Sequence, residues 1–281
     1  MRILITGAQG QLGHDVTLEC QRRGWEAIGV DLPDFDLTDR TATLSFLEKA
    51  APDCVIHCAA YTAVDKAEAE PEMARAVNEL GTGAVAKYCA RAGIWMINIS
   101  TDYVFDGSGN QPWEADDAPE PLNVYGATKL AGERAVQAVC EKHMIVRTSW
   151  VFGSHGNNFV KTMLRLGRER PELRVVSDQI GAPTYTVHLA HLLCDMAARP
   201  VKGIYHAANA GECSWAGFAR KIFEMAGIDC DVIEIPSSEY PQAAKRPKNS
   251  RLSPKALIEA NYATLPPWES ALAEFLSIER G

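Results

Sequence analysis

Short apolar runs alternate with longer amphipathic segments through the first half of the chain. The apolar runs at residues 2–6, 25–30, 54–57, 94–100 and 144–148 have the length and composition of strands buried on both faces. The segments between them, at 11–23, 38–51, 72–92 and 124–142, have the length and spacing of helices, and Thr38 is the expected N-cap of the second. Such alternation predicts an α/β protein with a Rossmann-like, doubly wound parallel sheet.

The alternation of strands and helices becomes less regular after about residue 150. Shorter helical segments, at 158–168, 187–198, 215–226 and 268–278, mix with short strands and proline-containing turns. We therefore predict a dinucleotide-binding Rossmann domain over 1–150. Residues 151–281 are expected to form mainly a smaller C-terminal substrate-binding lobe, with some segments returning to the sheet.

Composition narrows the class of protein. The 281 residues carry a formal net charge of −8, which argues against a nucleic-acid partner because phosphate backbones repel acidic surfaces. The eight cysteines form no Cys-x-x-Cys pair, so we expect reduced thiols rather than a zinc or disulfide framework. No apolar run approaches the roughly 20 residues of a membrane helix, and Gly7 comes too early for a signal peptide. These features predict a cytoplasmic protein without a membrane partner.

Three glycines follow the first predicted strand and open the first predicted helix. Gly7, Gly10 and Gly13 form a G-x-x-G-x-x-G pattern. Glycine at such a turn lets the backbone approach a pyrophosphate, which then rests on the helix N-terminus. A plain strand-to-helix turn is the alternative, but the position between strand and helix favours dinucleotide binding.

Asp31 follows the second predicted strand, where an acidic residue often binds the adenosine ribose. It favours NADH, and no basic residue between Asp31 and Leu37 is available for a 2′-phosphate, although Arg40 is near. A solvated carboxylate at a strand end is the alternative. The choice between NADH and NADPH stays open.

A Tyr and a Lys stand four residues apart at Tyr125 and Lys129, which places them on one helix face. Reduction of a ketone by hydride needs a proton donor, and Tyr can supply it if a nearby ammonium and a nicotinamide bring its pKa toward working pH. Thr101 ends the fourth predicted strand and can polarise the substrate carbonyl through its hydroxyl. These three residues are the predicted catalytic set. Lys129 can also hold the nicotinamide ribose, so Tyr125 and Lys129 are predicted to bind the cofactor as well.

The motifs together resemble the extended short-chain dehydrogenase/reductase superfamily and, more narrowly, the dTDP-4-dehydrorhamnose reductase family. The resemblance covers nearly the whole chain and rests on residues 59–68, 100–107, 121–126, 147–153, 179–184 and 246–252. It implies reduction of the C4 ketone of dTDP-4-dehydro-β-L-rhamnose to dTDP-L-rhamnose by NADPH or NADH, with a nucleotide-sugar as the partner.

The resemblance also implies roles for individual residues. Tyr125 would donate the proton, with Lys129 as its partner. The residues implied at the sugar are Thr101, Asp102, Tyr103 and Trp150, and a core position is the alternative for Trp150. The residues implied at the cofactor are Gly10, Gln11 and Leu12 for the pyrophosphate, Asp36 and Leu37 for the adenosine, and Ala60, Tyr61 and Thr62 for the nicotinamide side.

Two features bear on metal and assembly. Some members of the family are dimers joined through Mg²⁺, and Asp15 could be one ligand here. Residues 185–188 lack the carboxylate that a second ligand would need, so the sequence disfavours Mg²⁺ and leaves a monomer or a homodimer open. The basic stretch 245–251 could meet the substrate diphosphate or could be a solvated loop.

Three other functions are alternatives for a chain with this fold. A nucleotide-sugar 4,6-dehydratase usually has Asp-Glu after the threonine, whereas Asp102 and Tyr103 stand here. A 4-epimerase uses the same Tyr and Lys, and a tightly held NAD would distinguish it. A non-catalytic subunit, similar to the regulatory β subunit of methionine adenosyltransferase, would bind a partner instead; intact Thr101, Tyr125 and Lys129 favour the enzyme.

Overall fold

A six-stranded parallel sheet forms the centre of the computed structural model, which describes residues 1–33 and 35–279. Its strands are β1 (Arg2–Thr6), β2 (Glu26–Val30), β3 (Cys54–His57), β4 (Trp95–Thr101), β5 (His143–Thr148) and β10 (Gly203–His206), in the order β10-β5-β4-β3-β1-β2. Every neighbouring pair is parallel. The doubly wound fold predicted from the sequence is confirmed.

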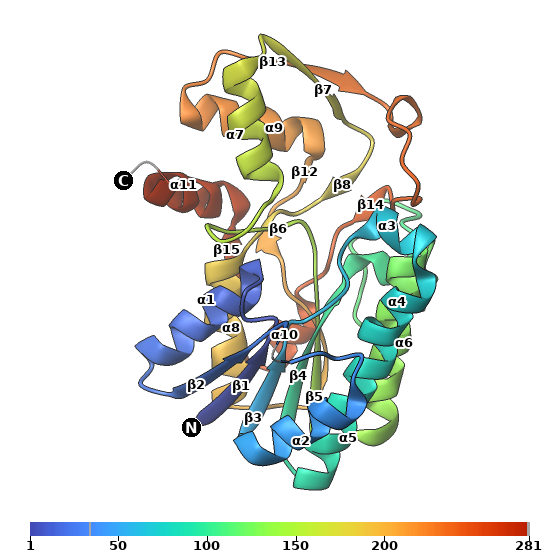
Figure 1. Ribbon diagram of the computed structural model, residues 1–281. Helices are drawn as coiled ribbons and strands as arrows, with labels where there is room; N and C mark the ends of the chain where they lie inside the picture. Colours follow the sequence, from blue (N-terminus) through green and yellow to red (C-terminus); the bar gives the residue numbers. More distant parts are fainter. Residues whose placement is uncertain (34, 280–281) are drawn as a thin grey trace.

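Helices cover both faces of this sheet (Figure 1). On one face α1 (Gln11–Arg22) and α8 (Thr186–Ala198) pack against Ile3, Ile5 and Ile56. On the other, α2 (Arg40–Ala50), α5 (Thr82–Ala92) and α6 (Val124–Val139) enclose Leu4 and Val55. Alternate residues of a strand point to opposite faces, so both helical layers draw apolar side chains from the same strands.

Some predicted helix boundaries are wrong. The expected helix at 72–92 is divided into α4 (Pro71–Arg75), the π-helix η1 (Ala76–Gly81) and α5, and α3 (Val64–Ala69) precedes them. Asp39, not Thr38, caps α2, since its side chain accepts from the amide of Ala42 at 2.9 Å while the Thr38 hydroxyl donates to Asp36. Helix α6 ends at Val139 because Cys140 adopts an extended backbone.

The second half of the chain builds a lobe beyond the carboxyl ends of the strands (Figure 1). Its core lies among α7 (Phe159–Glu169), α9 (Trp215–Ala226), α11 (Trp268–Glu279) and the parallel pair β7 (Glu172–Val176) and β13 (Asp231–Ile235). The second half also contains short elements: β6 (Val151–Phe152), β8 (Ile180–Gly181), β9 (Thr184–Tyr185), β11 (Asn209–Ala210), β12 (Cys213–Ser214), the 3₁₀ turn η3 (Ser237–Glu239), β14 (Asn249–Ser250), α10 (Lys255–Glu259) and β15 (Leu265–Pro267). Another 3₁₀ turn, η2 (Asp102–Val104), directly follows β4.

The division of the chain near residue 150 stays a prediction. Two elements of the second half belong to the sheet region: β10 is its edge strand, and α8 covers one of its faces. Over residues 1–33 and 35–279, no helix combines the length and the apolar character needed to cross a bilayer.

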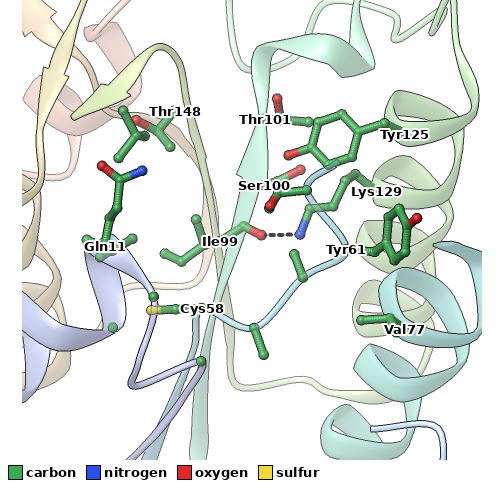
Figure 2. Close-up of a pocket in the computed structure, with 18 of the residues that line it drawn as sticks. Gln11, Cys58, Tyr61, Val77, Ile99, Ser100, Thr101, Tyr125, Lys129 and Thr148 are labelled. Carbon is green, nitrogen blue, oxygen red and sulfur yellow. Dashed lines mark hydrogen bonds between the residues drawn. The ribbon is translucent and has the colours of Figure 1, made fainter. Parts of the chain in front are cut away.

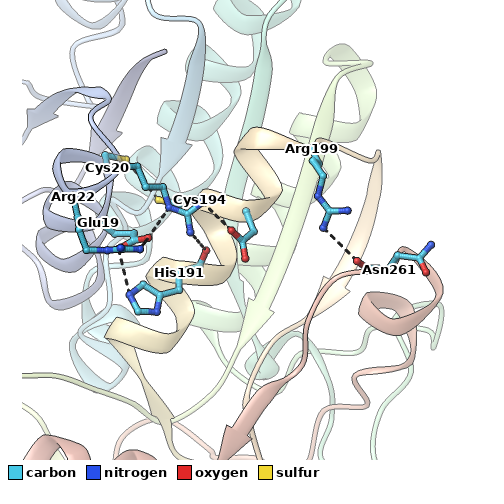
Figure 3. A network of polar contacts seen from close by, with 9 residues as sticks. Glu19, Cys20, Arg22, His191, Cys194, Arg199 and Asn261 are labelled. Carbon is cyan, nitrogen blue, oxygen red and sulfur yellow. Dashed lines mark hydrogen bonds and ion pairs between the residues drawn. The ribbon is translucent and has the colours of Figure 1, made fainter.

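A cluster of charges ties α1 to α8 (Figure 3). The Glu19 carboxylate, whose side chain is only 4% exposed, accepts from Arg22 at 2.6 Å and from Arg23 at 2.6 Å, and His191 of α8 lies 3.3 Å away. Arg23 also reaches Asp195 on α8 at 2.8 Å. Hydrogen bonding from Arg22, together with Arg23 and His191, holds the pKa of Glu19 at about 2, well below its ordinary value.

We expect Glu19→Gln to lower the free energy of unfolding by roughly 2 kcal/mol at neutral pH, a figure reduced from the full pKa shift because Arg22 is largely exposed. A carboxyl with a depressed pKa stabilises the fold above its unfolded pKa. The difference between wild type and variant should therefore be constant near neutrality and shrink as pH falls from about 4.5 to about 2. Urea unfolding at several pH values measures it, and a difference independent of pH would contradict the assignment.

Candidate active site

One large cleft lies between the carboxyl edge of the sheet and the lobe, with a volume of about 1130 Å³. All the residues that the sequence analysis predicted for the cofactor, the sugar and catalysis line it. They come from six places: the glycine turn, the segment after β2, the loop after β3, the end of β4, the start of α6 and the segment after β5. Figure 2 shows Gln11 and Cys58 on one side of this cleft and Tyr125 and Lys129 on the other. Ligands of doubly wound sheets bind at this edge.

The glycine turn packs too closely for side chains. An ideal Cβ at Gly13 would lie 2.1 Å from the carbonyl oxygen of Gly7, and one at Gly7 would lie 2.8 Å from Ala59. Gly7 also has φ of 67°, a conformation that favours glycine. Gly10 precedes α1 without a side-chain cap, so the first amides of this helix lie at the cleft with Gln11 and Leu12. A bare helix N-terminus of this kind fits the pyrophosphate of a dinucleotide.

Asp31 and Asp36 lie on the side of the cleft next to this turn. Asp31 Oδ2 accepts from the amide of Gln9 at 2.9 Å, so the strand-end carboxylate and the glycine turn are joined directly. Asp36 accepts from the amide and the hydroxyl of Thr38, and its neighbour Leu37 lines the cleft. These contacts fit an adenosine site at this end of the cleft.

Tyr125 and Lys129 lie one helical turn apart, as the spacing predicted. The ring of Tyr125 lies beside Thr101, and Lys129 Nζ donates to the carbonyl of Ile99 at 2.7 Å (Figure 2). Asn123 caps α6 by accepting from the amide of Gly126 at 2.8 Å, which fixes where the helix, and therefore Tyr125, begins. The phenol, the ammonium and the hydroxyl of Thr101 are thus brought together from α6 and β4.

Burial has the largest effect on the protonation of this group. Burial raises the pKa of Tyr125 to about 12, and the Thr101 hydroxyl only partly opposes the rise. Burial also lowers the pKa of Lys129 to about 8, with Glu133 opposing it. The Lys129 ammonium donates to the Ile99 carbonyl, and the expected lowering of the Tyr125 pKa by this ammonium together with a bound nicotinamide stays a prediction. Tyr125 is therefore a neutral phenol near neutral pH, the form that can give up a proton.

Asp102 is a buried carboxyl beside the proposed catalytic threonine. Thr101 donates to Asp102 Oδ1 at 3.1 Å, while Oδ2 is buried and lacks a hydrogen-bond partner among the described residues. Burial raises its pKa to about 6, against the effect of the Ser250 and Thr101 hydroxyls. An unsatisfied polar atom in a cleft is suited to a hydroxyl of a bound ligand. Tyr103 follows, with its ring 5.6 Å from that of Tyr125.

Asn78 is a site residue that the sequence analysis missed. It lies in the π-helix η1, accepts from the amide of Tyr61 at 2.8 Å, and donates to the Tyr61 carbonyl and to Thr128 of α6. It therefore holds the 60–62 loop against the catalytic helix. The only signal in the sequence was a polar residue inside an amphipathic helix, and π-turns, which often mark functional sites, leave no periodicity to read.

Trp150 and Trp215 form an aromatic wall on the lobe side of the cleft. Their rings stack with centroids 3.7 Å apart, and both line the cleft. Trp150 has φ of 49°, which turns its side chain out of the direction of β5. Trp215, which the sequence analysis did not single out, is held by a hydrogen bond from its indole to Gln179 at 3.2 Å.

Two remaining sequence candidates lie outside the cleft lining. In the basic stretch, Arg246 pairs with Asp65 at 2.6 Å, Lys248 with Asp178 at 3.0 Å, and Arg251 with Glu212. Asp15 is buried on α1, with Oδ1 3.3 Å from His14. Across the described ranges, no set of three or more His, Cys, Asp or Glu side chains is arranged to hold a metal ion.

Comparison with known proteins places the chain in a family. The profile described as RmlD substrate binding domain matches residues 1–280. The dTDP-4-dehydrorhamnose reductase of Escherichia coli strain K12 is 41% identical over 295 residues, covering 99% of this chain and 97% of the relative.

Two solved structures share the fold over their whole length. A dTDP-4-dehydrorhamnose reductase of Clostridium acetobutylicum superposes with a TM-score of 0.98 at 40% identity, covering 100% of both chains. That of Bacillus anthracis, solved in complex with NADP, gives 0.96 at 40% identity and covers 99% of both. The chain therefore belongs to the RmlD substrate binding domain family, the family of the dTDP-4-dehydrorhamnose reductases.

Proposed function

We propose that this chain reduces the C4 ketone of dTDP-4-dehydro-β-L-rhamnose to dTDP-L-rhamnose with NADPH or NADH. The observation that carries the proposal is the meeting of Tyr125, Lys129 and Thr101 in the same cleft as the glycine turn. The substrate follows from the relatives, whose names state this activity, and from full-length similarity to them.

The glycine turn, Asp31 and the 60–62 loop would hold the dinucleotide, which supplies the hydride when bound. The Tyr125 phenol donates the proton that the developing alkoxide needs, and its raised pKa keeps that proton in place until the carbonyl oxygen becomes basic. Thr101 orients the carbonyl oxygen, and Asp102 accepts from a sugar hydroxyl. Lys129, fixed by the Ile99 carbonyl, supplies positive charge beside the ribose position.

The remaining candidates of this fold fit the site less well. A 4,6-dehydratase would need a second acid or base next to Asp102, where the neutral phenol of Tyr103 stands, with burial raising its pKa above the usual range. A non-catalytic subunit has no need for a partly buried phenol, a buried ammonium and a buried hydroxyl held together. These features support the reductase over both.

The direct test supplies the purified full chain with enzymatically prepared dTDP-4-dehydro-L-rhamnose and, separately, NADPH and NADH. We expect the amount of reduced nicotinamide lost, measured by absorbance, to equal the amount of sugar consumed, and NMR to identify the product as dTDP-L-rhamnose. The ratio of the kcat/KM values for NADPH and NADH then shows which cofactor the enzyme prefers. Interconversion of sugars without net cofactor oxidation would indicate an epimerase. Folded protein that binds dinucleotide and oxidises none would indicate a binding subunit.

A further inference from the structure

A buried ion pair lies beneath the catalytic helix. Glu133 of α6 and Arg147 of β5 are 1% and 2% exposed, and Arg147 donates to both carboxylate oxygens, at 2.9 and 2.7 Å. A buried pair of this kind is weak evidence for stability, because removing both charges from water offsets much of their attraction. Its position relative to the proposed catalytic residues suggests a different role.

Helix α6 holds the end of β4 through three successive turns. Lys129 donates to the carbonyl of Ile99 at 2.7 Å, and the next residue, Ser100, donates to Glu133 Oε1 at 2.5 Å. The residue after that, Thr101, has its hydroxyl beside the phenol of Tyr125. Arg147 fixes Glu133 to β5. The hydrogen bond from Ser100 to Glu133 therefore fixes the position of the end of β4, and with it the position of the Thr101 hydroxyl in the cleft.

The charge of Glu133, one helical turn from Lys129, opposes the effect of burial on the pKa of Lys129. The other titratable groups around Lys129 are Tyr125 of α6 and, from β3 and the residue after it, His57 and Cys58. Arg147 of β5 binds the Glu133 carboxylate. β4 contributes no ionisable side chain. Burial and Lys129 lower the pKa of His57 to about 3, and burial raises the pKa values of Cys58 and Tyr125 to about 12, so these three are neutral near neutral pH.

We propose that Glu133 is a positioning residue for the reaction: through Ser100 it places Thr101, and through its charge it keeps Lys129 protonated at working pH. The proposal rests on the proposed function for its catalytic consequence, but the second half concerns Lys129 alone and can be measured without turnover. Arg147 is the partner that makes a buried carboxylate at this position tolerable.

Three variants separate the two roles. Ser100→Ala leaves the ion pair in place, and we expect kcat to fall on the order of tenfold while the pH at which activity declines on the alkaline side stays unchanged. The double variant Glu133→Gln, Arg147→Met removes both charges without leaving one buried alone. Its alkaline decline should move to lower pH by about half a unit or more. Glu133→Asp keeps the charge, and should keep the wild-type midpoint with a reduced kcat.

NMR of ¹³Cε-labelled lysine reads the Lys129 titration directly, with Lys129→Met used to assign its signal. A midpoint lowered in the double variant and unchanged in Ser100→Ala supports the proposal even if the sugar substrate proves wrong. Glu48→Gln is the control, since it removes one charge from an exposed pair with Arg91 and should change neither quantity. An unchanged Lys129 midpoint in the double variant, or loss of kcat that follows only loss of thermal stability, would overturn the proposal.

Discussion

Replacing Tyr125 with Phe is expected to lower kcat by about three to four orders of magnitude with either cofactor. The phenol is the proton donor of the proposed reaction, and in the described structure it is partly buried, with desolvation raising its pKa to about 12. Phe keeps the ring, which packs at 5.6 Å from that of Tyr103, so the cleft should keep its shape. Steady-state kinetics with the sugar substrate measures the loss.

Binding of the dinucleotide distinguishes a chemical defect from a structural one. Titration by calorimetry should give a dissociation constant within a few-fold of wild type for Tyr125→Phe, because the glycine turn lies across the cleft from Tyr125 (Figure 2). Tyr88→Phe removes a hydroxyl from α5 in the core and should leave kcat unchanged. Turnover near normal in Tyr125→Phe would remove the phenol from the mechanism.

Much of this architecture could be read from the sequence because the strands are buried on both faces. Runs such as 2–6 and 54–57 are short, apolar and separated by helical segments, and only a parallel sheet buries them all. The order of the motifs along the chain then predicts the site, since the carboxyl ends of parallel strands meet at one edge. Gly7 follows β1, Thr101 ends β4 and Tyr125 begins α6, and all three line the same cleft for this reason.

What could not be read depends on contacts between distant residues. Asn78 is significant because a π-turn directs it at the backbone of Tyr61. Glu133 looks like an ordinary helix residue until Arg147 and Ser100 meet it in the core. The direction of the Lys129 ammonium is a further case, because local spacing shows that Lys129 is near Tyr125 but not that its ammonium donates to the Ile99 carbonyl.

Replacing Gly13 with Ala is expected to abolish measurable dinucleotide binding and to destabilise the fold by about 1–3 kcal/mol. An ideal Cβ at this position would lie 2.1 Å from the Gly7 carbonyl oxygen, 2.6 Å from the Gly7 carbonyl carbon and 3.0 Å from the Ala8 Cα. All three are backbone atoms, so the contact cannot be relieved by rotating a side chain. The turn must move away from α1, which separates the helix N-terminus from the turn that would hold the pyrophosphate.

A matched glycine shows whether the effect is specific to the turn. Gly83 lies in α5, where an added Cβ would first meet the Ala135 Cβ at 3.4 Å, and Ala favours a helix over Gly by about 1 kcal/mol. Gly83→Ala should therefore bind dinucleotide as wild type does and unfold at an equal or higher denaturant concentration. Dinucleotide binding by Gly13→Ala at wild-type affinity would show that the close contact of Gly7 and Gly13 is not what forms the site, and that the cofactor lies elsewhere in the cleft.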